Sequence, residues 1–399
     1  MSDVPWLTIV GLGEDGAEGL SPASRKALEA AEAVFGAARH LDLLPAVPGP
    51  RFTWPVPFAE GIPKLLEWRG RPVVMLASGD PFWHGAGSVL ASHLTAAEWT
   101  ALPAPSTVSL AAARLGWPLE TTPCLGLHAA PFTRLRPYLA SGAKLLVLLR
   151  DGEAVGQLAA WLTETGFGST AMTVMEALGG PRERLRRSTA EALDLRDVAH
   201  PVCLALEAAG EGAVVPVASG RPDELFDHDG QMTKRPLRAL SLSALAPSAG
   251  EHLWDIGAGA GSIGIEWLLS HPANAATAIE MQPDRAARIR ANADRLGVDR
   301  LQVVVGEAPA ALQDLPEPDA VFVGGGLSDS LLSHLCERLS GRTRLVANAV
   351  TLESEALVTN WQVRKGGTLL RVCLSEAAPL GSKRAWRAAY PVVQWSVTL

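Results

Sequence analysis

The stretch LWDIGAGAGSIGIEWLL, residues 253–269, gives the strongest indication of a fold in this chain. It opens with an apolar run of strand length, continues with a glycine-rich turn, and then places Ile263, Trp267 and Leu268 at helical spacing. Glycines in such a turn remove Cβ atoms where a ligand can lie against the backbone, just ahead of a helix N-terminus. The glycines concerned are Gly257, Gly259 and Gly261. The stretch therefore predicts a strand–turn–helix unit that binds a nucleotide-like cofactor.

The identity of that cofactor depends on the acidic residues around the turn. An NAD site is one alternative, because Gly259, Gly261 and Gly264 also fit G-x-G-x-x-G. Glu280 ends the next apolar run and suits either cofactor, since its carboxylate can accept hydrogen bonds from ribose hydroxyls. Asp255 separates the two, because it would repel a pyrophosphate but would attract the ammonium group of S-adenosylmethionine (SAM). The pattern favours SAM, although the glycines would also serve a purely structural tight turn.

A third strand exit, VVVGEAPAAL at 303–312, places Gly306 and Glu307 where the carboxylate could reach the adenine amine. The pattern D-x-G-x-G-x-G, then Glu280, then G-E-A-P resembles the class I methyltransferases, which have a Rossmann-like α/β fold. The fourth strand exit reads VGGG and lacks the polar-Pro-Pro-aromatic tetrad typical of base methylation. With the segments at 230–245 and 347–356, it closely resembles the precorrin C-15 methyltransferase/decarboxylase domain.

The first half of the chain carries a different set of turns. Its first strand leads into Gly11, Gly13 and Gly16, again in the G-x-G-x-x-G spacing, but the next strand at 33–36 has no acidic residue at its exit. An NAD site is therefore not expected here, because such a site requires an acidic residue at the exit of the second strand. A further turn follows at S-G-D-P-F (78–82), where proline ends a buried strand. Another lies at P-A-P-S, where Ser106 or Thr107 can cap a helix, and a last one, L-G-G-P, lies at 178–181.

These four turns together resemble the tetrapyrrole methylase fold, the two-lobed class III methyltransferases, over about residues 5–207. The match is closest to the precorrin C-5 branch. It departs from the family at Glu14, where many relatives have proline, and at His84, where many have an aromatic residue. The resemblance implies a SAM pocket between the two lobes. Its candidate lining residues are Gly11, Gly13, Gly79, Asp80, Pro81 and Ser106.

Short β-branched or leucine-rich runs alternate with longer amphipathic segments along the whole chain, which is typical of α/β domains. The segment 215–231 has neither period and contains Pro216 and Pro222, so we place a domain boundary near its start. This gives a tetrapyrrole methylase domain at 1–210 and a class I domain at 220–399. Strands are predicted at 6–11, 33–35, 72–77, 144–149, 171–176, 202–207, 253–257, 276–280, 301–306, 320–325, 344–350, 369–374 and 392–397.

The candidate catalytic residues are Asp80 and His84, either of which could move a proton. The alternatives are structural roles, in which Asp80 caps a helix and His84 lies on a helix surface. The histidines show neither H-x-H nor H-E-x-x-H spacing, so no metal is expected. A substrate rich in acetate and propionate groups needs cationic partners. The candidates are Lys234, Arg235, Arg238, Arg384 and Arg387, some of which would simply be solvated.

The composition narrows the function classes. A formal net charge of −7 without a basic run disfavours nucleic-acid and anionic-membrane binding. The four cysteines have no C-x-x-C spacing, and the N-terminus carries Asp3 and Glu14 where a signal peptide would be apolar. We expect a cytoplasmic homo-oligomer.

Both resemblances point to the fused, decarboxylating SAM-dependent methyltransferases of cobalamin synthesis. They imply two SAM sites, methylation of a precorrin at C-5 and C-15, and loss of the C-12 acetate carboxylate. A nicotinamide-dependent precorrin reductase, an RNA methyltransferase and a non-enzymatic precorrin carrier are the alternatives. The sequence does not identify residues for the decarboxylation.

Overall fold

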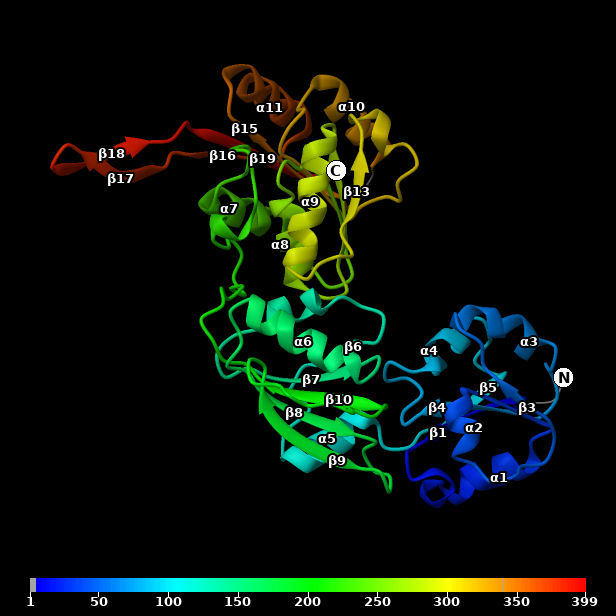
Figure 1. The fold of residues 1–399 in the computed structure, drawn as a ribbon. Coiled ribbons are helices and arrows are strands. Elements are labelled where there is room, and N and C mark those ends of the chain that lie inside the picture. Colours follow the sequence, from blue (N-terminus) through cyan, green and yellow to red (C-terminus); the bar gives the residue numbers. More distant parts are fainter. Residues whose placement is uncertain (1–4, 340) are drawn as a thin grey trace. The chain divides into compact units, whose positions relative to one another are not determined.

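The computed structural model describes residues 5–339 and 341–399. Its contacts divide the chain into two compact units: unit 1 comprises the chain up to Ala130 together with Ala140–Ala213, and unit 2 comprises Pro131–Leu139 and Val214–Leu399. The main division lies close to the boundary placed near residue 215, but Pro131–Leu139 belongs with the second unit. The two units are described separately (Figure 1).

The first lobe of unit 1 is an all-parallel sheet in the order β3-β2-β4-β1-β5. Strand β1 is buried on both faces, because Leu7 and Ile9 join the cluster under α3 and α4 while Val10 and Leu12 join the cluster under α1 and α2. The elements are β1 (Leu7–Leu12), α1 (Pro22–Ala30), β2 (Ala33–Gly36), α2 (Ala38–Asp42), β3 (Arg51–Thr53), α3 (Ile62–Leu66), β4 (Val73–Ser78), α4 (Ala86–Ala91) and β5 (Trp99–Leu102).

The second lobe of unit 1 is a mixed sheet in the order β6-β7-β10-β8-β9, in which only the β6–β7 pair is parallel. Helix α5 covers one face, where Val108 and Ala111 pack against Leu146 and Cys203. The elements are α5 (Thr107–Leu115), β6 (Cys124–Leu127), β7 (Lys144–Leu149), α6 (Glu153–Glu164), β8 (Ala171–Glu176), β9 (Arg184–Thr189) and β10 (Val202–Glu207).

Unit 2 is built on a seven-stranded sheet in the order β13-β12-β11-β14-β15-β19-β16, in which β19 runs antiparallel to both of its neighbours. The strand order reverses at β11, so the carboxyl ends of β11 and β14 flank the switch point where such sheets bind ligands. The elements are α7 (Arg235–Leu245), β11 (His252–Ile256), α8 (Ser262–Ser270), β12 (Ala275–Glu280), α9 (Pro283–Arg295), β13 (Gln302–Val305), β14 (Ala320–Val323), α10 (Asp329–Arg338), β15 (Arg344–Ala349), α11 (Leu352–Lys365), β16 (Thr368–Val372) and β19 (Val392–Thr398).

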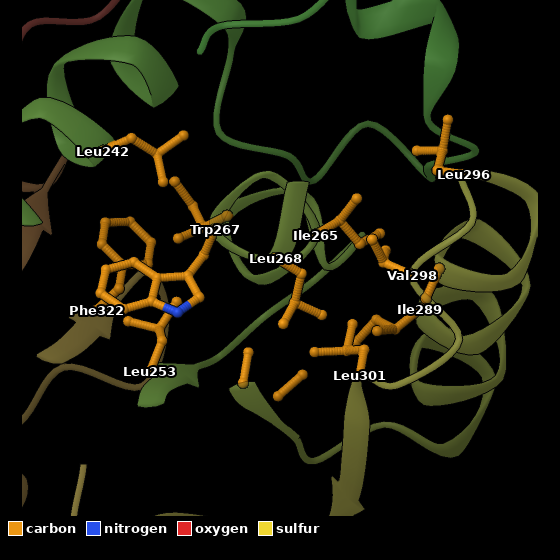
Figure 2. Close-up of a cluster of buried hydrophobic side chains, with 14 of the residues drawn as sticks. Leu242, Leu253, Ile265, Trp267, Leu268, Ile289, Leu296, Val298, Leu301 and Phe322 are labelled. Carbon is orange, nitrogen blue, oxygen red and sulfur yellow. The ribbon is translucent and has the colours of Figure 1, made fainter. Parts of the chain in front are cut away.

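The core of unit 2 fixes the helix that follows the glycine turn. Helix α8 is buried on nearly all sides, and Figure 2 shows Trp267 lying beside Phe322 of β14 with Leu242 of α7 above them. On its other side, Ile265 and Leu268 lie toward the residues around α9. Because the helix is held by three elements, its N-terminus and the preceding turn have a fixed position relative to the strand ends.

The hairpin of β17 (Ser375–Leu380) and β18 (Lys383–Ala388) extends away from the sheet of unit 2 (Figure 1). Its residues are almost entirely exposed. No helix in the described part of the chain is long and apolar enough to cross a membrane.

All thirteen predicted strands are confirmed, with boundaries that differ by at most two residues. Six further strands were missed: β3, β5, β6, β9 and the two strands of the hairpin. Strand β9 reads RLRRST, and β18 reads KRAWRA, so neither offers the apolar run that a buried strand shows.

Candidate functional site: two glycine cradles and a histidine-lined cavity

In unit 1 the ends of β1 and β4 and the segment after β5 approach each other so closely that side chains are excluded. A Cβ on Gly11 would lie 1.9 Å from the carbonyl oxygen of Gly79 and 2.5 Å from the amide nitrogen of Ala104. Gly79 itself has a φ of +52°, and its Cβ would lie 2.8 Å from the carbonyl oxygen of Pro105. The backbone amide of Ala104 donates to the carbonyl of Gly79 at 3.1 Å. Of the predicted cofactor residues of this unit, Gly11, Gly79 and Ser106 thus lie together at one backbone-walled corner.

Asp80 and Ser106 stand on either side of this corner. The carboxylate of Asp80 accepts a hydrogen bond from the amide of Phe82 at 2.9 Å, which closes an Asx turn rather than capping the next helix. Ser106 is the N-cap of α5 and accepts from the amide of Ser109 at 3.1 Å. Pro81 is buried beneath the loop, where its carbonyl oxygen would meet a Cβ on Gly85. These residues shape the loops, and their polar atoms keep further hydrogen-bonding capacity for a ligand.

Glu14, which departs from the family pattern, closes the opposite side of the β1 turn. Its carboxylate is buried and forms ion pairs with Arg39 and, at 3.0 Å, with Arg182. Gly180 of the L-G-G-P turn packs directly on Glu14, because a Cβ there would lie 2.6 Å from the Cβ of Glu14. The neighbouring Gly13 faces its own loop, where a Cβ would meet a carboxylate oxygen of Asp15. Glu14 therefore ties the first lobe to the turn after β8.

A cavity of about 430 Å³ lies between the two lobes of unit 1. Ser78 and Ser106 line it next to the glycine corner, and four of the nine histidines of the chain line it as well: His40, His84, His128 and His200. The sequence singled out only His84 of these. The other three come from α2, from the position just after β6 and from the position two residues before β10, and no local motif connects them.

Three of the four cavity histidines have lowered pKa values. Burial, reinforced by the charge of Arg39, lowers the pKa of His40 to about 4. The Nε2 atom of His40 lies 2.9 Å from both the guanidinium of Arg39 and the hydroxyl of Ser78. Desolvation by the surrounding protein also lowers the pKa of His128 and of His200, and Arg39 contributes at His200. At neutral pH these three imidazoles are predominantly uncharged.

His84 occupies an unusual backbone position at the edge of the same cavity. It has a φ of +53°, a conformation that residues other than glycine rarely adopt. Its ring lies against Gly126 of β6, where a Cβ would come within 2.9 Å of the Nδ1 atom. It is exposed and precedes α4, so it is not part of a helix surface. The structure brings the second catalytic candidate into the cavity alongside three histidines that the sequence did not indicate.

In unit 2 the predicted glycine turn forms a second cradle. Gly257, Gly259 and Gly261 all have positive φ values, between +61° and +76°. A Cβ on Gly257 would lie 2.6 Å from the backbone of Gly325, and a Cβ on Gly261 would lie 2.7 Å from Ile289. The ends of β11 and β14 thus meet through bare backbone, and Gly261 leaves room for Ile289 of α9 to pack against the turn.

The two predicted acidic residues border this cradle and differ in their surroundings. Asp255 is only 1% exposed; its Oδ2 atom accepts from the amide of Gly264 at 2.9 Å, whereas its Oδ1 atom is buried without a hydrogen-bond partner among the described residues. Burial, reinforced by the charge of Glu280, raises the pKa of Asp255 to about 7. Glu280 accepts from the amides of Gly259 at 2.9 Å and Gln282 at 3.0 Å. Glu280 therefore binds the turn itself, whereas Asp255 binds the first turn of α8.

The third strand exit lies next to this pair. The amide of Gly306 donates to the carbonyl of Glu280 at 3.0 Å, which places Glu307 at the same edge of the sheet with an exposed side chain. A cradle that a Cβ would fill and a buried carboxylate oxygen without a partner fit a ligand with an adenosine and an ammonium group. Among the described residues, no group of three or more His, Cys, Asp or Glu is placed to hold a metal ion.

The predicted cationic residues separate into three environments. Arg238 is fully buried on α7, where Glu266 at 2.6 Å and Asp223 at 3.0 Å occupy its guanidinium. Its role is therefore to anchor the segment before α7 rather than to face a substrate. Arg235 is exposed and donates to the carbonyl of Gly220 at 2.7 Å, and Lys234 is the exposed N-cap of α7. Arg384 and Arg387 both lie on the exposed strand β18.

Two family models match the chain. Residues 6–194 match the tetrapyrrole (corrin/porphyrin) methylases, and residues 224–399 match the precorrin methyltransferase domain. The two fold classes expected from the sequence, a tetrapyrrole methylase fold followed by a Rossmann-like fold, are confirmed. Together the fold and the two cradles define a methyltransferase built from two unrelated domains.

Individual proteins extend the likeness over the whole chain. A precorrin-6Y C(5,15)-methyltransferase (decarboxylating) of a Sinorhizobium species is 48% identical over 99% of this chain and 96% of its own length. A protein of the same name from Mycobacterium tuberculosis is 40% identical over 98% of this chain and 99% of its own. A crystal structure of the C-terminal domain of precorrin-6Y C5,15-methyltransferase from Rhodobacter capsulatus is 51% identical, with a TM-score of 0.45, and covers 46% of this chain and 100% of its own. The chain belongs to the family of the precorrin-6Y C(5,15)-methyltransferases (decarboxylating).

Proposed function

We propose that this chain is a bifunctional SAM-dependent C-methyltransferase of cobalamin biosynthesis. It methylates precorrin-6Y at C-5 and C-15 and removes the carboxylate of the C-12 acetate, which gives precorrin-8. The observation that carries the proposal is the presence of two unrelated glycine cradles, one at the strand ends of each unit. Names of relatives that match nearly the whole chain supply the substrate and the positions.

We assign the C-5 methylation to unit 1 and the C-15 methylation with decarboxylation to unit 2. The glycine corner of unit 1 opens beside the interlobe cavity, which offers space for part of a tetrapyrrole beside the cofactor loops. In unit 2 the cradle lies at the switch point of the sheet, beside the bare backbone of the VGGG segment. Each unit would hold one SAM, so the chain would bind two.

Bound SAM supplies an electrophilic methyl group in each unit. Transfer to carbon is an in-line displacement, so the protein contributes mainly position and the exclusion of water. In unit 1 the Gly11, Gly79 and Ser106 backbone would seat the cofactor against one wall of the cavity. In unit 2 Glu280 would orient the ribose, while the unpartnered Oδ1 atom of Asp255 would receive the methionine ammonium.

The carboxylates of the substrate would need cationic partners near each site. Lys234 and Arg235 are exposed at the start of α7 and remain candidates, as do Arg384 and Arg387 on the hairpin. Arg238 is left out, because its guanidinium is buried and already engaged.

We further propose that the chain acts in the cytoplasm as a homo-oligomer. The support for an oligomer is the β17–β18 hairpin, on which Trp386 is 77% exposed and Leu380 is 66% exposed, with Tyr390 just beyond it at 85%. Large apolar side chains on an otherwise bare hairpin are typical of a surface that pairs with another copy of the same chain. The support for a reducing compartment is that all four cysteines are free.

Product analysis with the full-length chain tests the proposal. Incubation with precorrin-6Y and SAM should give a product that has gained two methyl groups and lost carbon dioxide. Gly79→Ala, which places a Cβ in the unit 1 cradle, should give a decarboxylated product with one added methyl group. Gly257→Ala should block the reaction at the start, because we expect unit 2 to act first. Circular dichroism and thermal unfolding that match the wild type should show that each variant is folded. A wild-type product with one methyl group would contradict the proposal.

A further inference from the structure

Methylation at a ring carbon that carries hydrogen creates a need for a proton acceptor. When the methyl group moves, the bond between sulfur and carbon breaks and its electron pair stays on sulfur, while the ring π-electrons form the new carbon–carbon bond. The ring carbon then carries both a hydrogen and a methyl group, and the ring carries a positive charge. Restoring the double bond requires that the C–H electron pair return to the ring and that the proton leave to a base. A base positioned in the cavity of unit 1 would complete the reaction there.

We propose that His128 is this base, the group that takes the proton from the newly methylated carbon in unit 1; the inference rests on the proposed function of that unit. His128 directly follows β6 and lines the interlobe cavity. Its side chain remains open to solvent there, so a bound substrate can reach it. The cavity is also lined by Ser78 and Ser106, which adjoin the cofactor loops.

A hydrogen bond to the backbone fixes the tautomer of His128. Its Nδ1 atom lies 3.2 Å from the carbonyl oxygen of Leu149. A carbonyl oxygen only accepts, so Nδ1 carries the hydrogen, and in the neutral ring Nε2 holds the free lone pair. Such a second contact orients an imidazole for proton transfer in the way that a carboxylate or carbonyl orients many catalytic histidines.

The groups around His128 keep it ready to accept a proton. Partial desolvation lowers its pKa, and the neighbouring His84 adds to the effect. His200 also interacts with it, and His200 in turn faces Arg39, Glu14 and Asp151. A neutral ring at pH 7 holds the lone pair that a base needs, and the adjacent imidazoles offer the next acceptor on the way to solvent.

The other histidines of the cavity are less suited. The Nε2 atom of His40 is already engaged by Arg39 and Ser78, and the residue is buried. The charge of Arg39 opposes protonation of His200. His84 lies over Gly126, and Gly126 precedes His128 by two residues in the same extended segment. Alternate residues of an extended segment lie on the same face, so the rings of His84 and His128 are neighbours. This gives His84 the position of a partner to His128.

The variant His128→Asn separates a chemical from a structural role. The side-chain amide of Asn can still donate to the carbonyl of Leu149, but it lacks any atom in place of Nε2. His93→Asn, at an exposed position away from the cavity, is the matched control. Both are made in the full-length chain and given precorrin substrate with hydrogen or deuterium at C-5.

We expect His128→Asn to slow C-5 methylation about 100-fold or more, the usual contribution of a general base. KM for SAM and for the precorrin should change little. Deuterium at C-5 should slow the variant more than it slows the wild type. Added imidazole should restore part of the rate of the variant. Nuclear magnetic resonance of labelled histidine in the wild type should show Nδ1 protonated at His128. Unchanged rates with equal isotope effects in His128→Asn and wild type would overturn the inference. A wild-type chain that adds no methyl group at C-5 would instead overturn the proposed function.

Discussion

Replacement of Asp255 by asparagine should stabilise unit 2 and weaken its cofactor binding at the same time. The side chain is 1% exposed, and its Oδ2 atom accepts from Gly264 while its Oδ1 atom has no partner among the described residues. Asparagine keeps an acceptor for Gly264 but removes the charge. It also removes the anion that would face the ammonium of SAM.

The stability effect follows from the pKa of Asp255, which burial raises from 3.8 to about 7. Between these two values the folded chain holds a proton that the unfolded chain has released, so the free energy of unfolding falls as the pH rises through this window. A difference of about three pKa units corresponds to about 4 kcal/mol above pH 7. Asp255→Asn should remove this loss, and should therefore unfold at higher denaturant concentration than the wild type at pH 8.

The binding effect has the opposite sign. Loss of a hydrogen bond to a charged group costs about 1.5–3 kcal/mol, which is about tenfold to over a hundredfold in Kd. Calorimetry on the full-length chain should resolve a weakened SAM site in Asp255→Asn, and SAM binding to the wild type below pH 7 should release protons as Asp255 ionises. Denaturation should be followed as separate transitions, because a two-unit chain need not unfold in one step. Asp314→Asn, at an exposed position, is the matched control.

Two results would refute this reasoning. One is an Asp255→Asn chain that is less stable than the wild type at pH 8. The other is an unchanged affinity at both SAM sites, which would mean that the carboxylate does not face the cofactor.

Three further predictions concern stability and assembly. Burial lowers the pKa of His40 to about 4, so unit 1 should lose up to about 3 kcal/mol of stability as the pH falls from about 6.5 to 4. In a series of denaturation curves at different pH, His40→Gln should flatten this dependence. Glu266→Gln leaves the buried guanidinium of Arg221 without its carboxylate and that of Arg238 with Asp223 alone, and should lower the free energy of unfolding of unit 2 by about 3–5 kcal/mol in urea titrations. Trp386→Ser should reduce the oligomer measured by analytical ultracentrifugation without changing the thermal unfolding of unit 1; an unchanged mass would exclude the hairpin from the interface.

The sequence was most informative where local pattern and tertiary role coincide. In unit 2 the alternation of apolar runs and amphipathic segments predicted the strands, and the positive-φ glycines stand where the motif predicted a ligand turn. Asp255 and Glu280 could be placed because both end strands that lie side by side in a parallel sheet. Both carboxylates are buried, and the lack of a partner among the described residues for the Oδ1 atom of Asp255 could not be predicted, since it depends on how α8 packs over the strand end.

The cavity of unit 1 was largely hidden from sequence reasoning. His40, His128 and His200 follow no motif, and only the meeting of the two lobes brings them together. The burial of Arg238, by contrast, could have been predicted from the sequence. The residue lies four residues before Leu242 and seven before Leu245, on the face of α7 that enters the core, so helical spacing marks it as buried. The exposed strands of the hairpin lack an apolar face and gave no signal at all.

The central claim is that one chain holds two independent SAM sites. Calorimetric titration of the full-length chain with SAM tests it most directly, in the wild type, in Gly79→Ala and in Glu280→Ala. We expect two equivalents of SAM in the wild type and one tightly bound equivalent in each variant, with the remaining site unchanged in affinity. One equivalent in the wild type, or the loss of both sites through a single substitution in a folded chain, would contradict the claim.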